Sequence, residues 1–153
     1  MIVLGWREWL TLPELGVARL RAKVDTGARS SALHVDEQWR FVEAGAPWVG
    51  FRLTPGKSAT MGLIQASAPI FDEREVVDSG GHRCRRIFVC TLLRLAGQER
   101  RIEINLTNRR DMLFPMLLGR TALAGMFTVD PSCSFVHARP PRHLANESEE
   151  RTE

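Results

Sequence analysis

The stretch that decides the fold lies at residues 22–34 and reads AKVDTGARSSALH. A β-type segment, residues 19–24, runs directly into Asp25-Thr26-Gly27. Glycine lets the chain turn sharply there, and the small side chains leave the carboxylate open to approach. Such a turn can present a carboxylate for chemistry, although Asp-Thr-Gly alone is in most proteins simply a turn. The rest of the chain decides between these two interpretations.

The pattern of the whole chain predicts a mostly β protein. Helical patterning is scarce, and its best candidate is one or two turns at residues 121–125. Gly80-Gly81 and residues 96–98 predict two hairpins, because glycine supplies the positive φ of tight hairpin turns. Short segments with β-type patterning between turn signals cover residues 2–9, 19–24, 48–53, 86–95 and 101–106.

Length and composition predict one globular domain without a membrane span. The chain has 153 residues, of which 44% are hydrophobic and 25% charged, so a second full catalytic lobe does not fit. The longest apolar stretches, such as residues 112–118, are far shorter than the roughly 18 residues that a spanning helix needs. No secretory pattern is visible at residues 1–10, so we expect a cytoplasmic protein. Residues 139–153 are polar and acidic and predict a disordered tail after a domain at residues 1–138.

Charge and cysteine content argue against two function classes. The three cysteines are an odd number, which favours free thiols over a disulfide framework. The net charge is +3, and clusters of arginine occur at residues 83–86, 100–101 and 109–110. The chain has no tyrosine, and its seven phenylalanines and four tryptophans are not interleaved with these arginines, so we expect solvated strand faces and ion pairs rather than a nucleic-acid-binding surface.

A second motif favours the interpretation that the Asp-Thr-Gly turn presents a carboxylate for chemistry. Residues 112–123 read MLFPMLLGRTAL, an apolar run that ends in Leu-Leu-Gly-Arg before the expected short helix. The two motifs together resemble the retroviral-type aspartic peptidases, the retropepsins. In that family the Asp-Thr-Gly loop is followed by a flap hairpin, and an apolar-apolar-Gly-Arg segment then passes beneath the loop and enters a helix. Gly80-Gly81 occupies the place of the flap.

Further motifs sharpen the resemblance to one branch of this family. The chain is similar, over residues 2–137, to a bacterial and archaeal retropepsin-like family often labelled as an ATP-dependent zinc protease. The resemblance implies a closed β-barrel, half of an acid protease, with a flap and one short helix. Family members are often encoded near ATP-grasp ligases that add glutamates to a ribosomal protein, which implies a functional link to such a ligase. The motifs are LGWREW (4–9), KVDTGARSSALH (23–34), TNR (107–109), LLGRTAL (117–123) and VDPS (129–132).

The resemblance implies a catalytic arrangement that one copy of the chain cannot complete. An aspartic peptidase needs two carboxylates that share one proton. The chain has a single Asp-Thr-Gly, so we expect a homodimer with one Asp25 from each subunit. Thr26 would hydrogen-bond across the two-fold axis, and Gly27 would allow the turn. The resemblance also implies substrate contacts from the loop, the flap and the later segment: Ala28, Ser79, Gly80, Gly81, Leu118 and Arg120.

One departure from the retroviral pattern suggests a substrate. Retroviral enzymes carry an acidic residue shortly after Asp-Thr-Gly-Ala that pairs with the later arginine, whereas this chain has Arg29. Arg29, with His34 not far along the chain, would favour a substrate carboxylate, so we expect an acidic, glutamate-rich peptide. The alternative is that Arg29 forms a structural ion pair.

Neither ATP nor zinc is predicted from the residues. Residues 50–58 miss the phosphate-binding loop pattern by one position, and Pro55 removes a backbone donor. There is no His-Glu-x-x-His motif, and His82 with Cys84 and Cys90, or Cys133 with His137, are weak zinc candidates. We therefore expect no cofactor. A non-catalytic peptide-binding module and, third, a zinc-dependent protease remain as alternative functions.

One segment has no counterpart in the compact retroviral fold. Residues 36–71 lie between the Asp-Thr-Gly loop and the flap. We expect them to add a hairpin beside the barrel, with a role that the sequence does not indicate.

Overall fold

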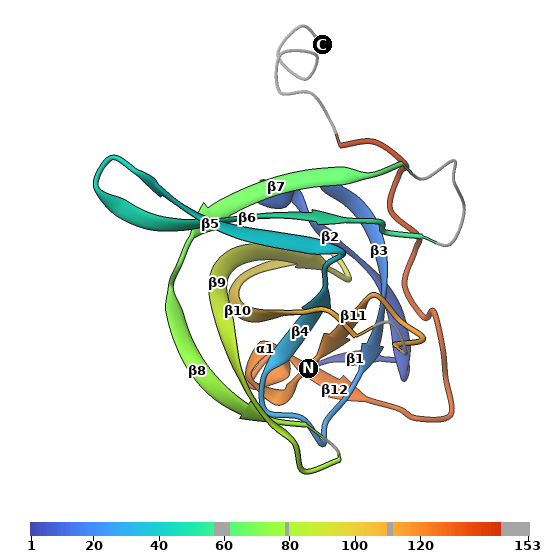
Figure 1. The fold of residues 1–153 in the computed structure, drawn as a ribbon. Coiled ribbons are helices and arrows are strands. Elements are labelled where there is room, and N and C mark those ends of the chain that lie inside the picture. The colour runs from blue at the N-terminus through green and yellow to red at the C-terminus, as the bar shows by residue number, and fades with distance from the viewer. Residues whose placement is uncertain (57–61, 79, 110–111, 145–153) are drawn as a thin grey trace, which may run out of the picture.

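The chain folds almost entirely into β-strands. The computed structural model describes residues 1–56, 62–78, 80–109 and 112–144 (Figure 1). In chain order the elements are β1 (Ile2–Leu4), β2 (Arg7–Leu12), a 3-10 turn (Pro13–Leu15), β3 (Val17–Val24), β4 (Ser31–His34), β5 (Glu37–Glu43), β6 (Ala46–Leu53), β7 (Ile64–Pro69), β8 (Asp72–Val77), β9 (Arg83–Leu95), β10 (Gln98–Thr107), β11 (Met116–Leu118), α1 (Arg120–Leu123) and β12 (Phe127–Val129).

The central sheet closes on itself, as the family resemblance implied. Its strands follow the order β10-β4-β11-β3-β2-β9, and β9 pairs in turn with β10, so the ring is complete (Figure 1). β4 runs parallel to β10, and β11 runs parallel to β3. Closure leaves no free edge within the ring, which is how barrels avoid unpaired backbone groups.

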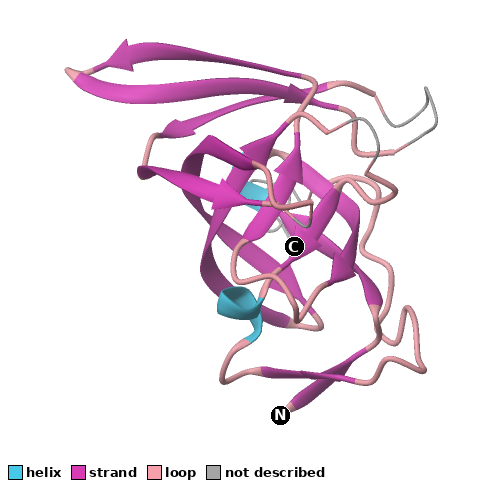
Figure 2. Ribbon diagram, turned by 60° about the horizontal axis from the view of Figure 1, so that its bottom comes forward, coloured by secondary structure: helices cyan, strands magenta, loops and turns pink. Residues whose placement is uncertain are grey.

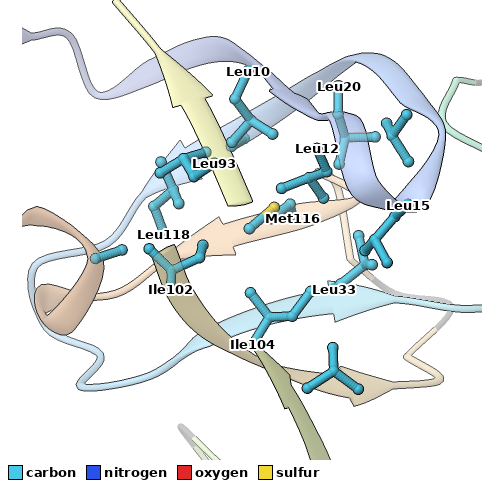
Figure 3. Close-up of a cluster of buried hydrophobic side chains, with 14 of the residues drawn as sticks. Leu10, Leu12, Leu15, Leu20, Leu33, Leu93, Ile102, Ile104, Met116 and Leu118 are labelled. Carbon is cyan, nitrogen blue, oxygen red and sulfur yellow. The ribbon is translucent and has the colours of Figure 1, made fainter. Parts of the chain in front are cut away.

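The interior of this barrel is filled by aliphatic side chains. Figure 3 shows Leu10 and Leu12 from β2, Leu33 from β4, and Met116 and Leu118 from β11 pointing toward one another. Each of the five is 0% exposed. Burial on this scale is the main favourable contribution to folding, and it also fixes the positions of the loops that follow β3 and β11.

The expectation of one added hairpin at residues 36–71 is wrong in its extent. The segment forms a three-stranded antiparallel sheet, β5-β6-β7, that lies as a separate layer over the barrel (Figure 2). Its middle strand contributes Val49, Phe51 and Leu53, all 0% exposed, to the same hydrophobic core as the barrel. β5 is mostly exposed although it carries Trp39 and Phe41, and β7 alternates with small residues, so neither strand resembles a buried core strand.

The segment predicted as one strand at residues 2–9 is broken into β1 and β2. Gly5 lies at the break, where a Cβ would stand 2.5 Å from the Cys133 carbonyl oxygen. β1 pairs in parallel with β12 instead of continuing into the barrel. The buried Glu8 carboxylate then ties the two ends of the chain together, because it accepts hydrogen bonds from the backbone N–H groups of Gly5 (2.7 Å), Val136 (3.0 Å) and His137 (3.2 Å).

Both predicted hairpins are confirmed. β8 pairs antiparallel with β9 up to Val77 and Arg83, which places the Gly80-Gly81 turn at the tip of the expected flap. β9 and β10 are joined through Ala96 and Gly97, which have φ values of 53° and 75°. The expected helix is a single turn, α1, and it begins at Arg120. Within the described residues no helix has the length and apolar character needed to cross a membrane.

The prediction of a disordered tail falls largely on residues that are not described. Residues 145–153 lie outside the described part of the chain. The described residues before them, 139–144, form no helix or strand. The Arg139 guanidinium carbon lies 5.9 Å from the centre of the Trp9 ring, so the chain is still in contact with the barrel there.

Candidate active site

The Asp-Thr-Gly turn directly follows a core strand. β3 ends at Val24, and the Asp25 backbone N–H donates to the Leu118 carbonyl at 2.8 Å, so β11 fixes where the turn begins. The Asp25 Oδ1 atom accepts the Gly27 N–H at 3.0 Å, and the Ala28 N–H donates to the Asp25 carbonyl at 3.2 Å. Asp25 Oδ2 has no hydrogen-bond partner among the described residues, which leaves one carboxylate oxygen available for chemistry.

The Leu-Leu-Gly-Arg segment crosses beneath this turn. Gly119 donates its N–H to the Ser31 Oγ atom at 3.0 Å, and the Arg120 N–H donates to the Ala28 carbonyl at 2.8 Å. The Thr121 N–H and hydroxyl both donate to the Arg29 carbonyl, each at 3.1 Å. The predicted crossing is therefore present, and it attaches α1 to the far side of the loop.

Arg120 supports the loop rather than a carboxylate. Its Nη1 atom donates to the Thr26 carbonyl at 3.0 Å. This contact replaces the acidic partner that the position of Arg29 would have supplied in the retroviral pattern. The guanidinium thus holds the backbone of the turn immediately after the Asp25 carboxylate.

An open cavity of about 1080 Å³ lies between the Asp-Thr-Gly turn and the flap strand β8. Asp25, Gly27, Ala28 and Arg29 line one wall, and residues 74–78 line another. Asp25 is half-buried, whereas Thr26 and Gly27 are exposed. The carboxylate therefore stands at the edge of a cleft whose turn is uncovered in the single chain.

The flap turn is held by one carboxylate. Asp78 Oδ1 accepts the backbone N–H groups of Gly80 and His82, each at 2.9 Å, and the Asp78 and His82 backbones also hydrogen-bond to each other. The hydrogen bond from the His82 N–H is the main cause that keeps the pKa of Asp78 below its usual value, and the Gly80 N–H adds to it. Ionised Asp78 thus favours a closed turn at the tip of the flap.

Within the described residues, three arginines of the predicted clusters form the expected ion pairs. Arg83 pairs with Glu75 at 3.5 Å, Arg85 with Glu73 at 3.2 Å, and Arg101 with Glu14 at 2.6 Å. Arg29 does not follow this pattern, because no carboxylate lies within ion-pair distance of its exposed side chain among the described residues. The alternative that Arg29 serves a structural ion pair has no support in the described part of the chain.

Several predicted substrate-contact residues lie outside the cavity lining, and their role stays a prediction. Leu118 is 0% exposed in the core, and Gly80 and Gly81 form the flap tip. His34 Nδ1 accepts the Arg109 backbone N–H at 3.2 Å, and its Nε2 atom is 3.4 Å from the Asp36 carboxylate. Ser79 lies outside the described residues.

Sequence reasoning missed a polar connection from the cavity into the barrel wall. Arg86 lines the cavity and donates through Nη1 to the Asn105 Oδ1 atom at 3.0 Å. Asn105 is 1% exposed, and its Nδ2 atom donates to the Ser31 carbonyl at 2.9 Å. The available signal was an asparagine between two aliphatic residues of β10, but the alternation of the strand places such a residue on a polar face and does not show that it is buried.

The zinc candidates do not converge in the described part of the chain. No three His, Cys, Asp or Glu side chains lie there close enough to hold a metal ion. His137 Nε2 is 2.8 Å from the Val3 carbonyl oxygen, and His82 lies beside Asp78. Of the near phosphate-loop, Gly50 belongs to β6, where a Cβ would stand 2.4 Å from the Trp39 ring, and residues 57–58 lie outside the described residues.

Comparison with known proteins agrees with this geometry. The model of the RimB-like family, described as retropepsin-like aspartic endopeptidase RimB, matches residues 3–140. The chain belongs to the RimB-like family. The match covers the barrel, the Asp-Thr-Gly turn, the flap and the crossing segment, so the family resemblance expected from the separated motifs is confirmed.

Individual relatives add two facts about the RimB-like chain. Proteins named probable alpha-L-glutamate ligase, from Shewanella pealeana and Parasynechococcus marenigrum, are 36% and 35% identical over 133 residues, which is 87% of this chain. That match covers only 29% and 28% of the two relatives, so the chain spans less than a third of their length. A crystal structure of Lpg0085, a protein of unknown function from Legionella pneumophila, has 29% identity and a TM-score of 0.75, covering 88% of this chain and 97% of that one.

Proposed function

We propose that the protein is an aspartic endopeptidase that acts as a homodimer. The observation that carries this proposal is the position of Asp25 at the edge of the cleft under the flap, with Oδ1 held by the Gly27 N–H at 3.0 Å and Oδ2 without a partner among the described residues. The uncovered Thr26 and Gly27 leave room for the same turn of a second copy.

The chemistry requires two carboxylates that share one proton. The ionised carboxylate takes a proton from water as the water attacks the scissile carbonyl, and the protonated carboxyl stabilises the developing oxyanion and supplies a proton toward the leaving nitrogen. Asp25 and the partner subunit's Asp25 would play these two parts. The flap strand β8 would cover the peptide and exclude water.

Charge in the cleft supports an acidic substrate. Arg29 stands in the wall beside Asp25 without an ion-pair partner among the described residues. A guanidinium binds a carboxylate through two parallel hydrogen bonds, so it favours glutamate-rich peptides. Relatives named as glutamate ligases support a functional link to an enzyme that adds glutamate.

A second candidate is a non-catalytic module that holds an acidic peptide. One observation on the relatives favours this candidate: the matching segment makes up 29% of a chain named as a ligase. In such a chain the segment could hold a peptide substrate for the rest of the protein. Asp25 would then bind or orient a ligand, and no peptide bond would break.

Peptide cleavage distinguishes the two candidates. Purified protein is incubated with glutamate-rich and neutral peptide libraries, with and without a chelator, and compared with Asp25→Asn, which keeps the shape of the side chain but cannot share a proton. The proposal requires chelator-resistant cleavage that disappears in the variant. Cleavage that is lost with the chelator supports the zinc protease, and binding without cleavage by a confirmed dimer supports the module.

A further inference from the structure

A second hollow continues from the Asp25 cleft toward the added sheet. It has a volume of about 640 Å³ and shares Asp78, Arg86 and Arg109 with the first cavity. Gln38, Trp39 and Arg40 of β5 form its outer wall. The two cavities therefore meet around Arg86, and the layer drawn above the barrel in Figure 2 borders the route that leads away from Asp25.

Arg86 is held by a neutral group instead of a carboxylate. Its Nη1 atom donates to Asn105, which is 1% exposed and is itself fixed by the Ser31 carbonyl. No carboxylate lies within ion-pair distance of Arg86 among the described residues. A guanidinium held by an amide keeps its full charge and most of its five N–H donors, so it is prepared to bind an anion.

The wall of the second hollow also carries more positive than negative charge. Arg40 and Arg85 both pair with the same carboxylate, that of Glu73. Asp78 uses Oδ1 to accept two backbone N–H groups of the flap turn. Asp78 keeps its negative charge, but Arg40, Arg85 and Arg86 outnumber it in the described lining, so the complement of the hollow is a ligand that brings carboxylates of its own.

We propose that this second hollow is a subsite for acidic side chains of the substrate peptide, with Arg86 as its specificity-determining residue. The proposal rests on the proposed peptidase function, because it places the scissile bond at Asp25 and the acidic residues along the route past Arg86. Asn105 is a positioning residue that aims the guanidinium. The added sheet supplies Arg40 and the Trp39 wall, which gives residues 36–71 a role in substrate binding.

Binding to the full chain carrying Asp25→Asn tests the subsite without cleavage. Fluorescently labelled polyglutamate and polyglutamine peptides of equal length are titrated and followed by anisotropy. We expect Arg86→Gln to weaken polyglutamate binding about tenfold or more, since a charge-assisted hydrogen bond is lost, and to leave polyglutamine binding unchanged. Asn105→Asp should weaken polyglutamate binding as well, because the new carboxylate neutralises Arg86. Arg94→Gln is the matched control, as Arg94 lies on the same strand and pairs with Glu99.

Peptide length separates the two cavities. Arg40→Gln should weaken binding of a long polyglutamate peptide and leave binding of a triglutamate peptide unaffected. If the long peptide bound Arg40→Gln as tightly as it binds the parent, the route along β5 would be overturned. The subsite would be overturned if Arg86→Gln bound polyglutamate as tightly as the parent does, or if Arg94→Gln lost as much affinity as Arg86→Gln. Both variants must melt at the parent's temperature for this comparison. If the chain with Asp25 intact bound polyglutamate through Arg86 but cleaved no peptide, the subsite would stand and the peptidase function would be rejected. If it cleaved peptides equally well without Arg86, the peptidase function would stand and the subsite would be rejected.

Discussion

Gly119 passes directly against the backbone of Ser30. A Cβ at position 119 would lie 2.6 Å from the Ser30 carbonyl carbon and oxygen. The two residues belong to the crossing segment and to the end of the Asp-Thr-Gly loop, so this contact joins the two parts of the candidate site. The Gly119 N–H bond to Ser31 Oγ at 3.0 Å and the Arg120 N–H bond to Ala28 maintain it.

The first prediction concerns this close approach. Gly119→Ala should destabilise the protein by about 3 kcal/mol, because the new methyl group forces two backbone segments apart. Chemical denaturation measures the loss. Gly80→Ala is the control, since its Cβ would meet only side chains: the His82 ring at 3.0 Å, which is 82% exposed and free to move, and Asp78 Oδ1 at an ordinary contact distance of 3.4 Å. Equal stability of the two variants would contradict the account of the crossing.

The second prediction concerns Arg120 and the geometry of the loop. Arg120→Gln removes the hydrogen bond to the Thr26 carbonyl. We expect kcat to fall about tenfold with a smaller change in KM, because the carboxylate loses its fixed orientation while the substrate wall is unchanged. Arg100→Gln serves as the control, because Arg100 binds the carbonyls of Ala122 and Ala124 at the end of α1 instead. A similar loss of kcat in both variants would assign the effect to α1 and not to the loop.

The third prediction concerns the buried carboxylate of Glu8. Glu8→Gln places an NH₂ group where a carboxylate oxygen accepts backbone N–H groups, so at least one of three donors loses its partner. Leaving a buried donor unsatisfied costs about 2 kcal/mol. Thermal and chemical denaturation test the loss against Glu43→Gln, which changes an exposed residue. If both variants unfolded at the same denaturant concentration, the hydrogen bonds to the Glu8 carboxylate would make no contribution to stability.

The fourth prediction concerns pH and the flap turn. The pKa of Asp78 is lowered chiefly by the His82 N–H, so the turn gains stability that is fully present above the usual aspartate pKa and is lost as the pH falls through the lowered value. Hydrogen exchange at Gly80 and His82 should therefore show a loss of protection, corrected for intrinsic exchange rates, at a pH below the usual aspartate range. In Asp78→Asn, where the amide oxygen still accepts but does not titrate, the same two amides should show no such step. A step that persists in the variant would point to another group.

The Asp-Thr-Gly turn and its supporting segment could be predicted because each is a short motif with a fixed structural meaning. In each motif the local structure is determined by adjacent residues. The motifs are Asp25-Thr26-Gly27 after an apolar strand and Leu-Leu-Gly-Arg before a helix. The flap was predictable for the same reason, since Gly81, with φ of 79°, adopts a backbone conformation that favours glycine.

The remaining features depend on contacts between distant parts of the chain. β4 and β11 are short, and their strand partners are brought together only by barrel closure. The added sheet was underestimated because β5 is mostly exposed, so its alternating Trp39 and Phe41 are only partly buried and do not mark a core strand. Asn105 follows the alternation of β10, yet pairing of β10 with both β4 and β9 buries it, so its role in holding Arg86 was not readable from spacing.

Mixing the parent protein with Asp25→Asn at fixed total concentration tests the shared-dyad claim most directly. If each active site needs one Asp25 from each subunit, an equal mixture in which subunits exchange freely contains active pairs as about a quarter of all pairs. Peptide cleavage should then fall to about a quarter of the rate of the parent alone, as a shared site requires. A fall to about one half would mean that each chain acts independently, which would contradict the two-fold aspartic dyad.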